Sequence, residues 1–160
     1  MPFPVTHPRR TERWTARPVQ DGLGAQGCGS KIVEVPSPFE VVLEFFACFD
    51  RGDLERAGQL VAEDAVITLF VSGEDPVELR GFESFVAWYS RRRELLGDSF
   101  SYRVEELLPG IRHAVALIAL SRGAGARRTN WRQVAVYTVD EGVVTALRGY
   151  EEPQTRSGSW

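Results

Sequence analysis

The chain has 160 residues, which is enough for one domain with its own hydrophobic core and too few for two ordinary domains. Hydrophobic residues make up 43% of the chain and aromatic residues 11%, which is typical of a globular protein, and no apolar run is long enough to span a membrane. The net charge of −3 gives no electrostatic support for nucleic-acid binding, so we expect neither a nucleic acid nor a membrane as partner.

Residues 1–36 differ in composition from the rest of the chain. They are rich in Pro, Gly and Arg, they show no apolar period, and they lack the continuous apolar core of a secretory signal. We interpret them as a flexible or partner-dependent arm that precedes a domain over residues 37–152 and a short tail over residues 153–160.

The two cysteines, Cys28 and Cys48, are too few and too far apart for a disulfide framework or a zinc site. A reduced compartment is the simplest interpretation, so we expect a cytoplasmic protein. No metal or other cofactor is predicted from the sequence.

Helix signals open the predicted domain. Ser37-Pro38-Phe39-Glu40 is a capping box with proline at the first helical position, and Val42, Phe45, Phe46 and Phe49 follow at helical spacing. Asp53 can cap a second, short helix. A third helix is predicted over Phe82–Leu96, with Gly97 as its stop.

Strand signals come between the second and third helices and dominate after the third. The expected strands cover Ala65–Val71, Ser101–Leu108, Arg112–Ser121, Thr129–Val139 and Val143–Glu151, and glycine-containing turns separate the last four. This order predicts an α+β domain in which helices cover one face of an antiparallel meander.

Two of the strands carry apolar side chains on both faces. In the strand over 112–121, one face holds Ala114, Ala116, Ile118 and Leu120, and the other holds Val115, Leu117 and Ala119. An antiparallel sheet with one wet face alternates more cleanly, and the helices can cover only one side. We therefore expect a homodimer that packs through the outer face of the sheet.

Three stretches together resemble the SnoaL-like branch of the nuclear transport factor 2 (NTF2-like) superfamily. They are FFACFDRGDLERAGQLVAEDAVITLF, RGFESFVAWY and VYTVDEGVVTALRGYEE, in an order and spacing that extend from Pro38 to about Glu152. The resemblance implies a cone, with three helices packed in a strongly curved, mainly antiparallel sheet around an apolar cavity. Members include ketosteroid isomerases, limonene-epoxide hydrolases, polyketide cyclases and non-catalytic adaptors, so the fold alone does not give the function.

The residues of the two best-known catalytic sets are missing from this chain. The resemblance places the epoxide hydrolase Asp–Arg–Asp set and its water-positioning residues on Ala116, Ile118, Gly149, Ile67 and Leu69. It places the isomerase base and its oxyanion-hole groups near Leu69, Phe45 and Ala135. None of these side chains can activate water or stabilise an oxyanion, which argues against both reactions.

Strand parity predicts which side chains face the cavity. Trp131, Gln133, Ala135 and Tyr137 fall inward on one strand, and Val143, Thr145, Leu147, Gly149 and Glu151 on the next. Apolar walls are expected from Phe45, Phe49, Ile67, Leu69, Ile118 and Leu120, and Tyr89 can point its hydroxyl inward. A pocket of this kind suits a flat or oily small molecule.

Glu151 is the candidate catalytic residue, because it is the only carboxylate that parity places on the inward side of these strands. Apolar walls would raise its pKa and make it a workable general acid or base, with Gln133 and the Trp131 indole N–H orienting the substrate. The alternative is a solvated glutamate at a strand end, beside Glu152. Trp131 can equally be a core aromatic, and Gln133 can be satisfied by backbone groups.

Two other polar features are interpreted without a catalytic role. Arg91-Arg92-Arg93 on the third helix is typical of a solvated face, and His113 is expected on the surface or at the dimer face.

The sequence thus predicts a SnoaL-like protein that binds an apolar or polyketide-like small molecule. If it is an enzyme, a cofactor-independent cyclisation or isomerisation with Glu151 as acid or base is the reaction that fits. The alternative is a ligand-binding or dimeric interaction module that has lost the catalytic residues of the family.

Overall fold

The three helices begin and end close to the residues that the sequence predicts. The computed structural model describes residues 35–153, 155 and 156, so the expected N-terminal arm lies outside the described residues apart from Val35 and Pro36. The helices are α1 (Pro38–Arg51), α2 (Leu54–Gln59) and α3 (Gly81–Leu96).

Side chains cap the first two helices as expected. The capping box at the start of α1 is complete, with the Ser37 side chain accepting from the Glu40 backbone N–H and the Glu40 carboxylate accepting from the Ser37 backbone N–H. Asp53 caps α2 by accepting from the Arg56 backbone N–H. Gly97 ends α3.

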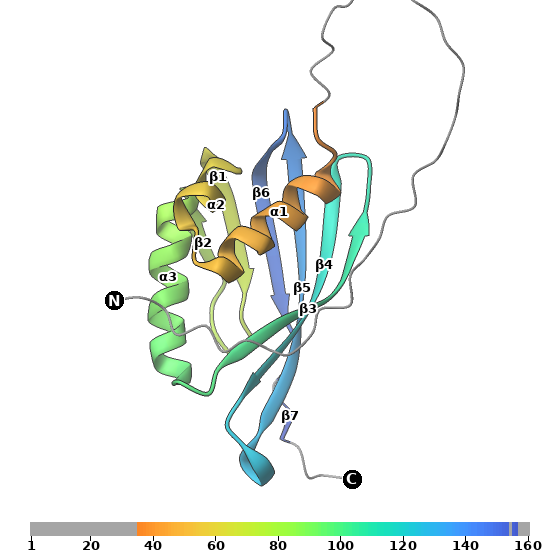
Figure 1. Cartoon of the computed structure of the whole chain (residues 1–160). Coiled ribbons are helices and arrows are strands. Elements are labelled where there is room, and N and C mark those ends of the chain that lie inside the picture. Colours follow the sequence, from red (N-terminus) through yellow and green to blue (C-terminus); the bar gives the residue numbers. More distant parts are fainter. Residues whose placement is uncertain (1–34, 154, 157–160) are drawn as a thin grey trace, which may run out of the picture. The chain divides into compact units, whose positions relative to one another are not determined.

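A mixed sheet forms the second layer of the fold (Figure 1). Its strands are β1 (Val61–Phe70), β2 (Val77–Arg80), β3 (Ser101–Pro109), β4 (His113–Arg122), β5 (Thr129–Asp140), β6 (Val143–Glu151) and β7 (Thr155–Arg156). The main path runs in the order β2-β1-β6-β5-β4-β3, and β7 pairs with β5. All pairs are antiparallel except β1 with β6. The predicted α+β class is confirmed.

Three strands differ from the sequence-based expectation. Strand β1 begins at Val61 rather than Ala65, because its first residues already pair with Val144 of β6. The loop expected between Ser72 and Gly81 contains edge strand β2, which Pro76 and the polar composition conceal. The expected tail contains β7.

The core lies between α1 and the inner face of the curved sheet (Figure 1). Helix α1 contributes Val41, Val42, Phe45 and Cys48, each at most 5% exposed, and the sheet contributes the face of β4 that carries Ala114, Ala116, Ile118 and Leu120. Each fully buried large apolar side chain adds about 1.5–3 kcal/mol to folding. The apolar face of α1 and the inward-facing side chains of β4 therefore form one core.

A register shift between β5 and β6 corrects the inward set on β6. The shift falls between Thr138 and Val139, so that Val144 rather than Val143 is buried. Thr145 is likewise half-exposed, and its hydroxyl donates to the Thr138 carbonyl at 3.4 Å. The predictions that Val143 and Thr145 face inward are wrong, because simple alternation does not continue through a bulge.

Gly81 supports a testable prediction about the junction of β2 and α3. Its φ is +73°, and a Cβ placed on it would lie 2.7 Å from the Glu63 carbonyl oxygen of β1. Gly81→Ala is therefore expected to lower the free energy of unfolding by about 3 kcal/mol, measured by urea denaturation. Gly73→Ala is the matched control, because Gly73 also has a positive φ, +83°, but no atom lies within 4 Å of the position that its Cβ would take. Equal losses in the two variants would contradict the steric argument.

Candidate functional site

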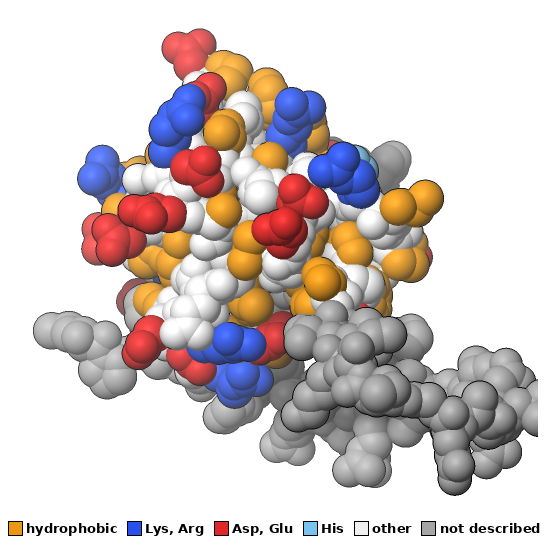
Figure 2. All heavy atoms as spheres, turned by 90° about the horizontal axis from the view of Figure 1, so that it is seen from above, with side chains coloured by type: hydrophobic (Ala, Val, Ile, Leu, Met, Phe, Trp, Pro, Cys, Tyr) orange, Lys and Arg blue, Asp and Glu red, His pale blue; other side chains and the backbone are white. Residues whose placement is uncertain are grey.

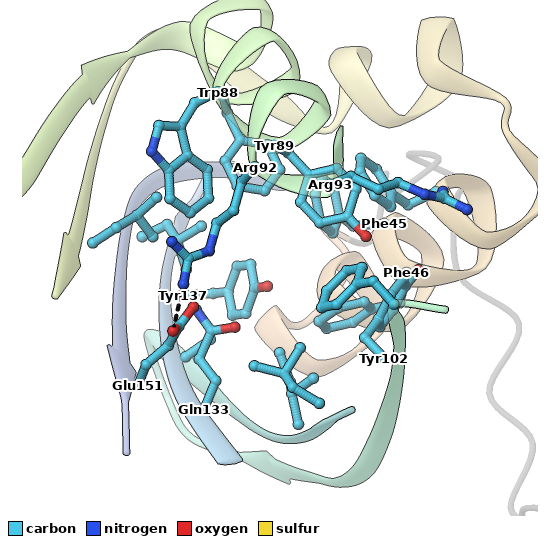
Figure 3. A pocket seen from close by; sticks show the side chains of 18 residues that line it. Phe45, Phe46, Trp88, Tyr89, Arg92, Arg93, Tyr102, Gln133, Tyr137 and Glu151 are labelled. Atoms are coloured by element: carbon cyan, nitrogen blue, oxygen red, sulfur yellow. Dashed lines mark hydrogen bonds and ion pairs between the residues drawn. The ribbon is translucent and has the colours of Figure 1, made fainter. Parts of the chain in front are cut away.

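A cavity opens between α1, α3 and the inner face of the sheet (Figure 3). Its volume is about 70 Å³. The interior is therefore narrow, and its wall is mainly aromatic. The lining residues are Phe45, Phe46, Phe49, Leu69, Phe85, Trp88, Tyr89, Arg92, Arg93, Phe100, Tyr102, Ile118, Leu120, Gln133, Ala135, Tyr137, Leu147 and Glu151.

Most residues of the candidate site gather around this cavity. Those on its wall are Phe45, Phe49, Leu69, Tyr89, Ile118, Leu120, Gln133, Ala135, Tyr137, Leu147 and Glu151. Ile67 lines a smaller adjoining cavity of about 10 Å³. Trp131 and Gly149 are not on the wall of either cavity.

Trp131 and Gly149 support the wall from outside. Trp131 is 4% exposed and packs on Phe100, with ring centroids 6.1 Å apart. Gly149 lies beneath Gln133, whose amide nitrogen is 2.6 Å from the position that a Cβ on Gly149 would take. The missing side chain at Gly149 therefore leaves the space that the Gln133 amide occupies.

Several wall residues lie outside the site that the sequence predicts. Phe46, Phe85, Trp88, Phe100 and Tyr102 complete the aromatic lining, and Arg92 and Arg93 add charge. A helical-spacing signal exists for α3, because Phe85, Trp88, Tyr89 and Arg92 fall on one face at intervals of three and four residues. Phe100 immediately precedes β3, and Tyr102 is the second residue of that strand. Alternation is too short at this point to predict that their side chains line the cavity.

The charged centre of the cavity is an ion pair between Glu151 and Arg92 (Figure 3). An Arg92 guanidinium N–H donates to a Glu151 carboxylate oxygen at 2.7 Å, and the Arg92 and Glu151 side chains are 15% and 6% exposed, respectively. Glu151 is thus buried at the end of β6, whereas its neighbour Glu152 is exposed. The solvated alternative for Glu151 does not describe this geometry.

Arg92 belongs to two further contacts. Its guanidinium carbon lies 5.4 Å from the centroid of the Trp88 ring, and a second guanidinium nitrogen lies 3.3 Å from a carboxylate oxygen of Glu74 in the loop before β2. The interpretation of Arg91–Arg93 as a solvated face is therefore wrong for Arg92, although Arg91 is exposed. Successive side chains on a helix point about 100° apart, so a run of three arginines does not keep all of its members on one solvated face.

Burial raises the pKa of the Glu151 carboxyl above its ordinary value. Arg92 acts in the opposite direction through its charge and its hydrogen bond, and the Trp131 indole N–H lowers the pKa further. The Trp131 indole nitrogen is itself buried and has no hydrogen-bond partner among the described residues. Desolvation outweighs both, so Glu151 is easier to protonate than a surface glutamate.

A second polar cluster lies on the other side of the cavity and consists of two tyrosines and an aspartate. The Tyr102 hydroxyl donates to the Asp50 carboxylate, which is itself exposed at the end of α1. Tyr89 packs edge-on against Tyr102, with ring centroids 6.5 Å apart. Tyr137 stands between this cluster and Glu151 and points its hydroxyl into the cavity (Figure 3).

His113 lies away from the cavity and is exposed at the start of β4. Figure 2 shows one face of the molecule, on which acidic and basic side chains are interspersed with hydrophobic ones. Among the described residues, no helix has the length and apolar character needed to cross a membrane.

Comparison with known protein families identifies the family to which this fold belongs. Residues 42–147 match the model of the SnoaL-like domain family. No curated protein matches the chain.

Solved structures give the same fold at low identity. An NTF2-like protein from Burkholderia thailandensis is 17% identical, with a TM-score of 0.64 over 73% of this chain and 92% of that chain. A candidate ketosteroid isomerase from Kribbella flavida is 17% identical, with a TM-score of 0.60 over 77% of this chain and 83% of that chain. An NTF2-like protein of unknown function from Mesorhizobium loti is 21% identical, with a TM-score of 0.57 over 71% of this chain and 89% of that chain.

Proposed function

This chain belongs to the SnoaL-like domain family, and on that premise we propose that it binds a flat, largely apolar small molecule in its aromatic cavity and uses Glu151 as a general acid or base. Membership of this family supports the assignment of the chain as a small-molecule-binding protein or a protein of the isomerase or cyclase type. The reaction class that fits is a cyclisation or isomerisation that moves a proton and needs no cofactor.

The observation that carries the proposal is a buried carboxyl on the wall of an aromatic cavity. The Glu151 side chain is 6% exposed, and burial raises its pKa, so that it is easier to protonate than a surface glutamate. A group of this kind is rare in a purely structural wall, because a buried charge costs folding free energy.

Neighbouring groups give Glu151 its role in the proposed reaction. Arg92 fixes the carboxylate at 2.7 Å, and we assign Trp131 no contact with the substrate, because it is not on the cavity wall. The Gln133 side-chain amide faces the cavity and has no hydrogen-bond partner among the described residues. It can therefore donate to a substrate carbonyl while Glu151 removes the proton on the adjacent carbon.

The competing function is a binding module without catalysis. The Arg92–Glu151 pair favours it, because an arginine at 2.7 Å opposes protonation of the carboxylate and occupies one of its two oxygens. In that case the pair only closes one side of a ligand pocket.

Proton exchange on a simple ketone tests the proposal. 2-Tetralone is a flat bicyclic ketone with acidic C–H groups beside its carbonyl, and exchange of these hydrogens for deuterium in D₂O can be followed by NMR. We expect the protein to accelerate this exchange over buffer. Binding without acceleration would favour the module that lacks catalysis, and an absence of binding would contradict both functions.

We also propose that the chain forms a homodimer through the outer face of the sheet. Val115, Leu117, Val134 and Val136 form an apolar stripe on that face, away from the helices. Beside it, Phe70 stacks on Tyr150 with ring centroids 4.8 Å apart, although the two residues are 38% and 43% exposed. A second copy can bury this self-complementary surface about a two-fold axis.

Val134→Arg is expected to convert the dimer into a monomer, because each protomer would bury an unpaired charge in the interface. Sedimentation velocity at micromolar concentration measures the change, and we expect dissociation to become at least about 100-fold more favourable. Leu43→Arg is the control, since Leu43 is a 52% exposed apolar residue of α1 on another surface. A monomeric wild-type protein at this concentration would exclude the dimer.

A further inference from the structure

The tyrosine cluster on the far side of the cavity has a defined direction of hydrogen bonding. Tyr102 donates its proton outward to the exposed Asp50 carboxylate, so its oxygen retains lone pairs for a donor that comes from the cavity. Tyr102 lines the cavity wall. Because Asp50 accepts the Tyr102 hydrogen bond outside the cavity, the Tyr102 oxygen is left to act as a hydrogen-bond acceptor toward the cavity.

Tyr137 supplies the complementary donor. The residue is 4% exposed, its hydroxyl points into the cavity, and that hydroxyl has no hydrogen-bond partner among the described residues (Figure 3). Burial is the cause that raises its pKa, with no hydrogen bond contributing. A ligand group that enters the cavity can therefore accept a hydrogen bond from this hydroxyl.

The electrostatics of the cluster favour a neutral partner. Desolvation raises the pKa of Tyr102, and the Asp50 charge raises it further, so this phenol stays protonated at neutral pH. Desolvation also raises the pKa of Tyr89 to about 12, with Arg93 lowering it and Asp50 raising it. An anionic ligand group would be attracted by Arg93, which also lines the cavity, but repelled by Asp50, so the Asp50 side of the cluster favours an uncharged group.

We propose that Tyr102 and Tyr137, with Tyr89 beside them, form a subsite for an uncharged hydroxyl group of the ligand. The ligand hydroxyl accepts from Tyr137 and donates to the Tyr102 oxygen, which a carbonyl or an ether cannot do. Since Glu151, Arg92 and Gln133 lie across the cavity from Tyr102 and Tyr89, with Tyr137 between the two groups, the ligand carries its hydroxyl on the tyrosine side and its reacting group on the Glu151 side (Figure 3). This inference rests on the proposed small-molecule binding.

Three small fluorinated aromatics test the subsite through ¹⁹F NMR titration. 4-Fluorophenol can donate and accept, 4-fluoroanisole can only accept, and fluorobenzene can do neither. For the wild-type protein we expect 4-fluorophenol to bind at least about 10-fold more tightly than either of the others. Affinities for ligands of this size are expected on the order of 1 mM.

Tyr137→Phe is expected to remove most of the preference for 4-fluorophenol while leaving the binding of fluorobenzene within about two-fold. The variant should also be at least as stable as the wild type, because the deleted hydroxyl has no partner to lose among the described residues. Tyr150→Phe is the matched control, since Tyr150 is 43% exposed on the outer face of the sheet. A preference that survives in Tyr137→Phe would overturn the subsite.

The remaining outcomes separate this inference from the proposed function. Equal binding of all three probes by the wild type would overturn the hydroxyl subsite and leave small-molecule binding intact. If Glu151→Gln abolishes the preference for 4-fluorophenol and Tyr137→Phe does not, the ligand hydroxyl binds on the Glu151 side of the cavity. That result would also overturn the proposed subsite. If none of the probes binds, the proposed small-molecule binding and the subsite both fail.

Discussion

Glu151→Gln is expected to lower the rate of 2-tetralone hydrogen exchange by about 10²–10⁴-fold, the usual contribution of a positioned acid or base. Glutamine keeps the shape of the side chain, and its amide oxygen can still accept from Arg92, which donates to Glu151 at 2.7 Å in the wild type. The variant therefore removes the titratable group and little else. Deuterium incorporation measured by NMR at saturating ketone gives the comparison.

The pH dependence sharpens this test. Burial raises the pKa of Glu151, so exchange catalysed by the carboxylate should rise with pH through a range above that of an ordinary glutamate. Glu152→Gln is the control, because Glu152 is the exposed neighbour and its variant should catalyse exchange as fast as the wild type. A wild-type rate in Glu151→Gln, or a rate that rises at the pH of a surface glutamate, would rule out the proposed role.

Removing Arg92 should have the second-largest effect, this time on stability. Arg92→Met leaves the Glu151 carboxylate, 6% exposed, without its counter-charge, and we expect the free energy of unfolding to fall by about 2–3 kcal/mol at about pH 8. Part of this loss is independent of pH, because the guanidinium also lies 5.4 Å from the Trp88 ring. Urea denaturation at about pH 5 and about pH 8 separates the two parts.

The sign of the pH effect follows from the direction of the shift. Burial raises the pKa of Glu151 and Arg92 lowers it, so the variant has a still higher pKa. A carboxyl that binds its proton more tightly when folded favours folding at low pH, and that advantage is lost as the pH rises through its folded pKa. The loss should therefore be smaller at the lower pH than at the higher one.

Two control variants complete the Arg92 experiment. Arg91→Met changes the exposed neighbour and should be nearly neutral at both values of pH. The double variant Arg92→Met/Glu151→Gln should recover most of the pH-dependent loss, because no buried charge remains. An equal loss at the two values of pH in Arg92→Met would show that Glu151 does not depend on Arg92.

The elements that could be predicted from sequence are those whose signals are local. Ser37 and Glu40 form the expected capping box, because both partners lie within one helical turn. The alternation in β4 separates buried Ala114 and Ala116 from half-buried Val115 without interruption. Strand β2 has no such signal, since its pairing with β1 depends on a partner that lies across a loop.

The limits of prediction for the site have the same physical origin. Alternation places Glu151 inward correctly at its end of β6, but a bulge opposite Thr138 shifts the phase at Val143 and Thr145. Arg92 is separated from Glu151 by 59 positions, so its burial depends on how α3 is turned against the sheet. The bond between Tyr102 and Asp50 likewise joins a strand and a helix that no local pattern connects.

Gly149 has a consequence for the evolutionary path of this cavity. A single-nucleotide change converts a glycine codon into an aspartate codon, and the resemblance places a catalytic acid of the epoxide hydrolases at this position. A side chain there would lie 2.6 Å from the Gln133 amide nitrogen and 2.9 Å from a Leu69 methyl group. Both atoms lie at the ends of flexible side chains, so an acid at this position would displace the Gln133 amide from its place in the cavity, and the chain can present either the acid or the amide there.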